Sequence, residues 1–311
     1  MSNSTAALAR SITKTNSKQT YFTACLLVDK DLVDDCFRAY AYFRWVDDVV
    51  DIYSQTRVER ISFIQRQIGL IDRLYNNDLP DGLIPEEQIL ADIISHERRV
   101  NGRLQSFIRK FLAIIEFDAY RKGRLIRQSE LDWYQDCLGR SVTDGIQYFV
   151  GNCCPYPDTP YHYHAATAAH ITHMLRDMVQ DIEEGYVNIP SDYLEEHNIN
   201  PGDITSLPFR TWVQARIELA REYFNEGKSY LDELDVLRCK IAGHWYCARF
   251  EGVLDAIERD GYRLRRDYSQ HRKLTTWIKM ARLASSLTIQ HYDCRKKAVH
   301  REFQDSQQVQ Y

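Results

Sequence analysis

The chain is poor in residues that interrupt helices. Only 8 prolines occur among 311 residues, and they gather at 78–85, 155–160 and 190–208. Because proline ends or kinks a helix, the long segments between these clusters remain free to be helical. Strict alternation of apolar and polar residues, the signal of a half-buried strand, is nearly absent. These absences argue against a fold built on a sheet.

Three further absences narrow the class of protein. The 8 cysteines lack a framework of C-x-x-C pairs and histidines, so we expect reduced thiols in a cytoplasmic protein and no zinc site. The first 20 residues lack an apolar signal core, and no segment offers 18 uninterrupted apolar residues, which predicts a chain that is soluble or at most rests on a membrane surface. A net charge of −4 argues against a nucleic-acid binder.

Apolar and aromatic residues recur at three- and four-residue spacing through most of the chain. The segments are 31–54, 57–77, 103–121, 130–152, 162–184, 210–235 and 237–260. This period predicts an all-α protein with long helices, and 44% hydrophobic residues suffice for a large core. Composition does not shift enough to mark a boundary, so we expect one domain over 1–311, in which 262–311 form a basic C-terminal helix and tail.

Three carboxylates stand within five residues in the stretch FRWVDDVVD, which otherwise predicts a buried helix. Residues four apart share one face of an α-helix, so Asp47 and Asp51 should point the same way, with Asp48 to one side. Arg44 precedes Asp47 by three residues on that face. Like charges at this spacing repel, and an unpaired buried carboxylate costs several kcal/mol, so the pattern favours a bound cation.

A second pair of the same spacing occurs in LRDMVQDIEEGYVNIP. Asp177 and Asp181 are four apart, Arg176 precedes them, and the helix should end near Gly185, with Pro190 beyond. Two such faces across a cavity would suit Mg²⁺ and a diphosphate, because Mg²⁺ prefers a few carboxylates, water and phosphate oxygens. The alternative, two solvated acidic faces, is disfavoured because each pair has an adjacent arginine and apolar neighbours.

These motifs resemble the squalene/phytoene synthase family, whose members join two isoprenyl diphosphates head to head. YAYFRWVDDVVD and LRDMVQDIEEGYVNIP resemble its two aspartate-rich motifs. KQTYFTACLLVDKDLVDDCFRAYAYFR, ELDWYQDCLGRSV and CARFEGVLDAIERDGYRL resemble its N-terminal block, central helix and late helix. The resemblance spans roughly residues 17–265, is that of a divergent bacterial-type member, and implies the class I isoprenoid (terpene) synthase helical bundle with a central active-site cavity.

The resemblance also implies roles for individual residues. The expected metal and catalytic carboxylates are Asp47, Asp48, Asp51, Asp177 and Asp181. The expected contacts to diphosphate are Arg44, Arg176, Lys18 and Tyr21. Beside the resemblance, Asp136, Arg140 and Phe250 are candidates for substrate contacts, and Arg265 and Arg266 are candidates for diphosphate contacts. We add Tyr134 and His173 to the catalytic candidates, and Trp245 and Tyr246, with Tyr134 and Phe250, to the candidates for a prenyl tunnel.

Several of these positions depart from the family pattern. His170 and His173 stand where Gln and Asn are usual, and Gln180 stands where Glu is usual. Asp136, Gly139 and Arg140 replace a Tyr and an Ala-Gly pair, and Phe250 replaces a Tyr. Two interpretations stay open for the histidines: hydrogen-bonded packing, or ordering a diphosphate and accepting a proton. Asp136 and Arg140 form either a simple intrahelical ion pair or a rebuilt substrate site.

The leading hypothesis is a Mg²⁺-dependent transferase that condenses two farnesyl or geranylgeranyl diphosphates to a squalene-, dehydrosqualene- or phytoene-like hydrocarbon. NADPH would be needed only for squalene. A terpene cyclase acting on one prenyl diphosphate and a non-catalytic assembly factor are the alternatives. The segment TTWIKMARLASSLTIQHY predicts an amphipathic helix that either rests on an anionic membrane or presents a solvated basic face. The sequence carries no signal for the oligomeric state.

Overall fold

A computed structural model describes residues 2–97, 102–152, 154–157, 159–268, 278 and 280–293. These residues contain no β-strand, which confirms the predicted all-α class. The helices are α1 (Ser2–Asn16), α2 (Lys18–Leu27), α3 (Val33–Asp48), α4 (Arg57–Tyr75), α5 (Pro85–Ser95), α6 (Arg103–Arg121), α7 (Gln128–Val150), α8 (His164–Glu184), α9 (Ser191–Glu196), α10 (Leu207–Glu233) and α11 (Leu237–Arg259), with short turns η1 (Lys30–Leu32), η2 (Val49–Tyr53) and η3 (Pro160–Tyr163).

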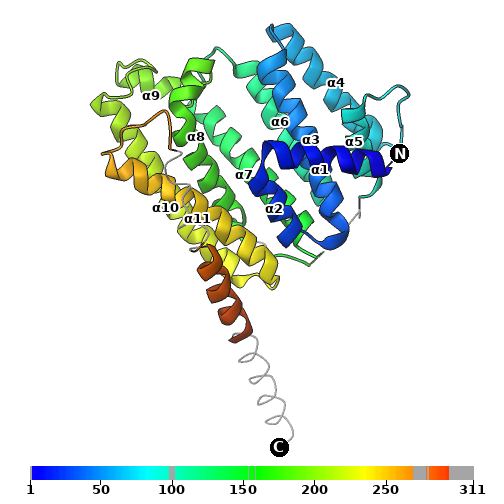
Figure 1. Cartoon of the computed structure of the whole chain (residues 1–311). Coiled ribbons are helices and arrows are strands. Elements are labelled where there is room, and N and C mark those ends of the chain that lie inside the picture. Colours follow the sequence, from blue (N-terminus) through cyan, green and yellow to red (C-terminus); the bar gives the residue numbers. More distant parts are fainter. Residues whose placement is uncertain are drawn as a thin grey trace, which may run out of the picture.

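The helices form two groups that share one member. Helices α1, α3, α4, α5 and α6 pack together on one side, and α8, α10 and α11 pack together on the other. Helix α7 packs against both α6 and α8, and in Figure 1 it runs between the two groups. A continuous cluster of buried apolar residues extends through both groups. The aspartate motifs therefore belong to different groups, at the ends of α3 and α8.

Close backbone approaches set the spacing of the second group. A Cβ added to Gly227 of α10 would lie 2.4 Å from the backbone nitrogen of Ala165 on α8. A Cβ on Gly243 of α11 would lie 2.5 Å from a methyl group of Leu231. Contacts this short are not available to a residue with a side chain, so these two glycines allow α8, α10 and α11 to pack closely.

The first aspartate motif does not lie on one regular helix. The α-helix α3 ends at Asp48, and Val49–Tyr53 form a turn of π-helix, closed by a 2.9 Å hydrogen bond from the Ser54 N–H to the Val49 carbonyl. The prediction that Asp47 and Asp51 share a regular α-helical face is therefore wrong in this detail. The π-turn adds one residue to the loop of each hydrogen bond and so turns Asp51 relative to Asp47.

The described part of the C-terminal segment is a helix over residues 280–293. It begins beside α11, where the Trp245 indole N–H donates to the Met280 carbonyl at 2.9 Å, and Figure 1 shows it extending away from the bundle. Residues 269–277, 279 and 294–311 of the predicted basic helix and tail lie outside the described residues. Within the described ranges, no helix is both long and apolar enough to cross a membrane. A single domain over 1–311 stays a prediction.

Candidate active site

Arg44 holds the first aspartate motif in place. Its Nε and Nη2 donate to the two carboxylate oxygens of Asp48 at 3.2 and 2.5 Å, and its Nη1 lies 3.7 Å from Asp47. Asp48 is thus the principal partner, and Asp47 is less strongly paired. Burial, together with the negative charges of Asp51, Asp118 and Asp48, raises the pKa of Asp47 to about 7 against the opposing effect of Arg44.

In the second motif, both nearby cationic side chains bind Asp177 and not Asp181. Arg176 donates to both oxygens of Asp177 at 2.6 and 2.5 Å, and His173 Nε2 lies 2.9 Å from the same carboxylate. Burial opposes ionisation of Asp177, but these hydrogen bonds outweigh it and hold its pKa far below the usual range. One turn further on, burial and the charge of Asp177 raise the pKa of Asp181 to about 7. Each motif therefore has one well-neutralised carboxylate and one that is short of positive charge.

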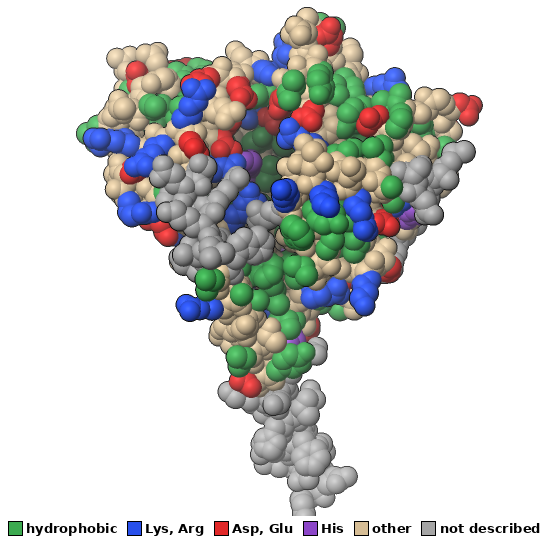
Figure 2. All heavy atoms as spheres, in the orientation of Figure 1, with side chains coloured by type: hydrophobic (Ala, Val, Ile, Leu, Met, Phe, Trp, Pro, Cys, Tyr) green, Lys and Arg blue, Asp and Glu red, His purple; other side chains and the backbone are tan. Residues whose placement is uncertain are grey.

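Contacts from the chain just after α8 connect the two motifs. The Tyr186 hydroxyl donates to Asp51 Oδ1 at 2.5 Å, and the Asn188 amide donates to Asp181 Oδ2 at 2.9 Å. Asp118, at the end of α6, raises the pKa of both Asp47 and Asp181, so it lies near one carboxylate of each motif. The two acidic clusters thus face a common space. Figure 2 shows a hollow in this face of the molecule with acidic and histidine side chains at its margin.

Asp118 was not among the sequence candidates, although it is central in the structure. The Tyr134 hydroxyl donates to its Oδ2 at 2.9 Å and Arg121 Nε donates to its Oδ1 at 2.5 Å. Burial raises the pKa of Asp118 despite these partners. In the sequence, Asp118 and Arg121 read as an ordinary ion pair on an amphipathic helix. The signal that could have singled them out is a charged pair at the end of a strongly apolar helix.

A buried polar cluster lies on the α7 side of α8. The His170 ring packs against the Tyr134 ring with centroids 5.1 Å apart, and neither ring nitrogen finds a hydrogen-bond partner among the described residues. Burial, with the positive charges of His173, Arg121 and Arg216, keeps the pKa of His170 well below its ordinary value. His170 is therefore a neutral packing residue in this arrangement, whereas His173 is exposed and bound to Asp177.

The other central-helix candidates lie nearer the surface. Arg140 Nε donates to both oxygens of Asp136 at 2.9 and 2.8 Å, and its guanidinium lies 4.5 Å above the Tyr163 ring. Both partners of this intrahelical pair are substantially exposed. Phe250 is buried, with its ring centroid 6.3 Å from that of His173 and 5.1 Å from that of Tyr246. Phe250 thus forms an apolar wall beside the second motif.

The remaining candidates lie around the rim. Tyr21 stacks on Phe37 with centroids 5.3 Å apart, and Lys18 is exposed at the start of α2. Arg266 pairs with Glu183 at 2.8 Å, next to the second motif. Arg265 pairs with Asp260 instead. The structure thus shows Arg266 in an exposed ion pair two residues beyond Asp181, and Tyr21 in an aromatic packing contact.

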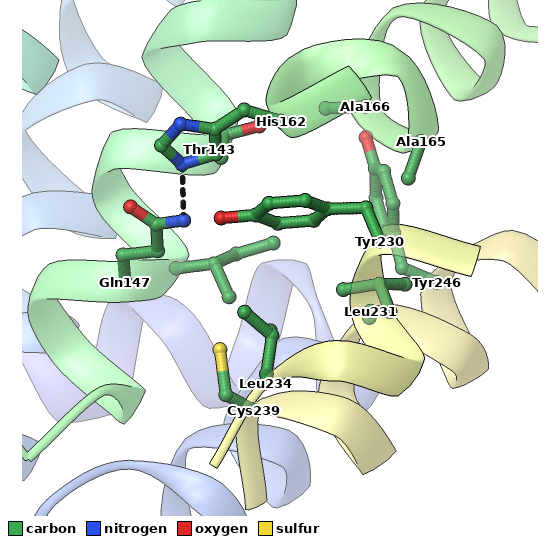
Figure 3. Close-up of a pocket in the computed structure, with 12 residues that line it drawn as sticks. Thr143, Gln147, His162, Ala165, Ala166, Tyr230, Leu231, Leu234, Cys239 and Tyr246 are labelled. Carbon is green, nitrogen blue, oxygen red and sulfur yellow. Dashed lines mark hydrogen bonds between the residues drawn. The ribbon is translucent and has the colours of Figure 1, made fainter. Parts of the chain in front are cut away.

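A small apolar pocket lies deeper between α7, α8, α10 and α11. Its walls include Thr143, Ala166, Leu231 and Tyr246, and one end is polar (Figure 3). There His162 from η3 hydrogen-bonds to Gln147, and the Tyr230 hydroxyl points toward the same amide. Further lining residues are Ile146, Ala165, Leu234, Cys239 and Gly243. Since Tyr246 also contacts Phe250, the pocket begins just beneath the apolar wall of the second motif.

The aspartate carboxylates would suit Mg²⁺ if water and a substrate diphosphate supply the remaining ligands. Among the residues that the structure describes, no three His, Cys, Asp or Glu side chains are grouped so that they could hold a metal ion. Mg²⁺ does not require such a group, because it is usually bound by one or two carboxylates, several waters and substrate phosphates. Asp47 and Asp181, whose pKa values are raised by burial first and by neighbouring carboxylates second, are the carboxylates suited to this role. Asp48 and Asp177 are already held by arginines.

The all-α bundle has the isoprenoid synthase helical fold, which is also the fold of its structural neighbours. A sequence profile of the squalene/phytoene synthase family matches residues 14–277, and the chain belongs to this family. The family consists of enzymes that use prenyl diphosphates. The resemblance identified from the motifs is thereby confirmed.

Two curated relatives match part of their length. A bifunctional lycopene cyclase/phytoene synthase of Podospora anserina is 22% identical over 253 residues, which are 73% of this chain and 42% of that protein. A phytoene synthase of Thermus thermophilus is 31% identical over 99 residues, 30% of this chain and 34% of the relative. The aligned region thus spans less than half of each of these relatives.

Two solved structures share the fold over most of their length. A squalene synthase HpnC from Alicyclobacillus acidocaldarius has a TM-score of 0.65 and 20% identity, and the match covers 85% of this chain and 97% of that one. A dehydrosqualene synthase in complex with ligand has a TM-score of 0.71 and 15% identity, with 92% and 96% covered.

Proposed function

We propose that this protein is a Mg²⁺-dependent prenyltransferase that condenses two isoprenyl diphosphates head to head and releases diphosphate. The observation that carries the proposal is the meeting of the two aspartate motifs, which Tyr186 joins directly through its bond to Asp51. Family membership and relatives named phytoene synthase support the same activity. The product would be a squalene-, dehydrosqualene- or phytoene-like hydrocarbon.

Different residues would contact the diphosphate head group and the hydrocarbon chain. Mg²⁺, when bound, would neutralise the charge that develops on the diphosphate as its bond to carbon breaks. Arg44 and Arg176 bind their aspartates through two nitrogens each, an arrangement that can be re-formed with phosphate oxygens. The ring of Phe250 would offer a face that stabilises a carbocation and excludes water, and Tyr134, whose hydroxyl binds Asp118, would hold that carboxylate in place.

The apolar pocket would receive the far end of a prenyl chain. The contact between Phe250 and Tyr246, which lines the pocket, supports this proposal, because a hydrocarbon whose diphosphate lies at the aspartates would have to pass these two rings. The polar end formed by Gln147 and His162 would limit further extension, because burying these amide and imidazole groups against hydrocarbon is unfavourable.

The direct test is product analysis. The purified chain is incubated with farnesyl or geranylgeranyl diphosphate and Mg²⁺, with and without NADPH, and both diphosphate release and product mass are measured. A hydrocarbon with twice the carbon count of the substrate supports the proposal. A terpene with one substrate's carbon count would establish cyclisation instead, and no diphosphate release with either substrate would contradict both reactions.

Matched variants separate catalysis from an assembly role. Asp177→Ala should abolish turnover, whereas Asp78→Ala, which removes an exposed carboxylate paired only with a surface arginine, should leave it unchanged. Equal turnover of the Asp177→Ala variant and the unaltered chain would contradict the assignment of the second motif.

We also propose that the product leaves toward a membrane surface. Phe22 and Leu26 of α2 are 50% and 64% exposed, and Ile289 and Tyr292 of the C-terminal helix are 63% and 55% exposed. Figure 2 shows apolar side chains gathered below the hollow, with basic side chains at their margin. Such a surface suits an anionic bilayer. Sedimentation with anionic but not neutral vesicles is expected; equal recovery with both, or with neither, would contradict it.

A further inference from the structure

Arg121 sits where contacts from both aspartate motifs converge. Its Nε donates to Asp118 at 2.5 Å, and its Nη1 donates to the side-chain oxygen of Asn188 at 2.7 Å. Asn188 in turn donates to Asp181 at 2.9 Å, while Asp118 accepts from Tyr134. One buried guanidinium therefore fixes a carboxylate at the end of α6, a tyrosine of α7 and a carboxylate of the second motif.

Aromatic rings restrain the guanidinium further. Its central carbon lies 4.7 Å from the ring centroid of Tyr134 and 5.2 Å from that of Tyr186. Tyr186 is the residue whose hydroxyl binds Asp51 of the first motif. Arg121 thus touches the two tyrosines that face the carboxylates, and it reaches the first motif through Tyr186 and the second through Asn188.

The two residues after Arg121 extend the same connection through the backbone. The Lys122 ammonium donates to the Asp51 carbonyl at 3.2 Å. The Gly123 N–H donates to the Gly185 carbonyl at 2.8 Å, and both glycines adopt left-handed backbone angles, with φ of +81° and +90°. A side chain would be strained at either position. Arg121, Lys122 and Gly123 therefore bind the first motif, the end of α8 and the segment that follows α8.

We propose that Arg121 is a positioning residue that sets the separation and orientation of the two aspartate motifs, so that a carboxylate of each reaches one Mg²⁺–diphosphate assembly. This inference rests on the proposed function. Its physical basis is that outer-shell partners fix the orientation of ligating carboxylates. Arg121 binds Asp118 through Nε and Asn188 through Nη1. Lysine would keep the charge, but its single nitrogen cannot occupy both of these positions.

The matched control is a second buried arginine of the same geometry. Arg38 on α3 pairs with Asp35 three residues before it at 2.6 Å, as Arg121 pairs with Asp118 three residues before it, and both arginine side chains are about 5% exposed or less. Arg38→Lys therefore imposes the same chemical change and a similar packing disturbance at a place that no contact described above joins to the motifs.

The experiment measures binding by the full chain, not turnover alone. Isothermal titration with inorganic diphosphate in the presence of Mg²⁺ is carried out on the unaltered chain, Arg121→Lys, Asn188→Leu and Arg38→Lys, and thermal unfolding without Mg²⁺ confirms that each variant is folded. Arg121→Lys and Asn188→Leu should weaken binding by about 10- to 100-fold, the usual effect of losing an outer-shell partner. Arg38→Lys should bind within about threefold of the unaltered chain.

Turnover provides the second measurement. A positioning role predicts that Arg121→Lys raises the Mg²⁺ concentration needed for half-maximal rate and lowers kcat in the same preparation. Binding equal to that of the unaltered chain, or an equal loss in Arg38→Lys, would overturn the inference. If the unaltered chain binds no diphosphate with Mg²⁺, the proposed function is wrong, and the inference fails with it. If the unaltered chain binds but Arg121→Lys binds equally well, only the inference is wrong. Should Arg121→Lys not fold, Asn188→Leu alone decides the question.

Discussion

Protons and Mg²⁺ should compete for Asp47 and Asp181, and the competition has a predictable size. Both carboxyl groups have pKa values raised to about 7, by burial first and by neighbouring carboxylates second. A group of pKa about 7 is roughly one-tenth ionised at pH 6 and roughly nine-tenths ionised at pH 8. Because a metal ion binds only the ionised form, Mg²⁺ affinity should rise by about tenfold for each participating carboxylate across this interval.

The same raised pKa values make the stability of the metal-free protein fall with rising pH, whereas Mg²⁺ affinity rises. A carboxyl group whose pKa is raised in the folded state keeps its proton longer than in the unfolded chain. The metal-free protein should therefore lose stability as pH rises from the ordinary value of 3.8 to about 7, and change little from this source above that. Added Mg²⁺ with diphosphate should restore stability most strongly at the upper end of the range.

Titration calorimetry at pH 6, 7 and 8 measures both consequences. Repeating it at pH 7 in two buffers of different ionisation enthalpy counts the protons released on binding. About one in total is expected if both carboxylates participate, because a group of pKa about 7 is roughly half protonated at pH 7. Asp78→Asn serves as a control. Arg73 lowers the pKa of Asp78, so this carboxylate stays ionised from pH 6 to pH 8. An affinity that is equal at pH 6 and pH 8, with no proton released, would refute the reasoning.

Three further predictions concern packing, the surface pair and the pocket. Gly227→Ala should destabilise the fold by about 1–3 kcal/mol through overpacking against α8, whereas Gly252→Ala, whose added methyl meets nothing within 4 Å, should not lower the melting temperature. Asp136→Asn breaks an exposed pair with Arg140 and should change stability by less than about 1 kcal/mol, so a large loss of kcat/KM at unchanged melting temperature would instead reveal a contact with substrate. Thr143→Leu narrows the pocket and should lower kcat/KM for geranylgeranyl diphosphate more than for farnesyl diphosphate; equal effects on both would argue that the chain does not reach this pocket.

Much of the fold could be predicted from periodicity because the long helices bury one continuous apolar stripe. The predicted segments at 57–77, 103–121 and 237–260 correspond to α4, α6 and α11 within two residues at each end. Periodicity did not predict helices α1, α2 and α5, because they are short or begin in polar sequence. The end of α8 at Gly185 was correctly predicted because glycine there adopts the left-handed conformation that closes a helix.

The parts of the site that were missed depend on distant contacts. Asp118 and Arg121 acquire their meaning only when α6 ends beside the chain that follows α8, which no local pattern reveals. Tyr186 and Asn188 lie within the second motif, yet their roles follow from hydrogen bonds to Asp51 and Asp181. The π-turn after Asp48 was also invisible, because one shifted backbone hydrogen bond leaves no mark on residue spacing.

The position of His170 was left open by the sequence and is decided by packing. Its ring is buried against Tyr134, whereas His173, one turn further along α8, is exposed and bound to Asp177. A histidine at this spacing from Asp177 could equally have been exposed, and the sequence does not distinguish the two cases.

Helix α7 is shared by the two helical groups, and this limits how substrate can enter. A hinged enzyme separates two bodies joined by a linker, but here the helix between the groups packs against α6 on one side and α8 on the other. Widening the mouth would strip that helix of apolar neighbours along much of its length. We therefore expect long hydrocarbons to enter and leave through small rearrangements of the rim, with the separation of the two aspartate motifs preserved.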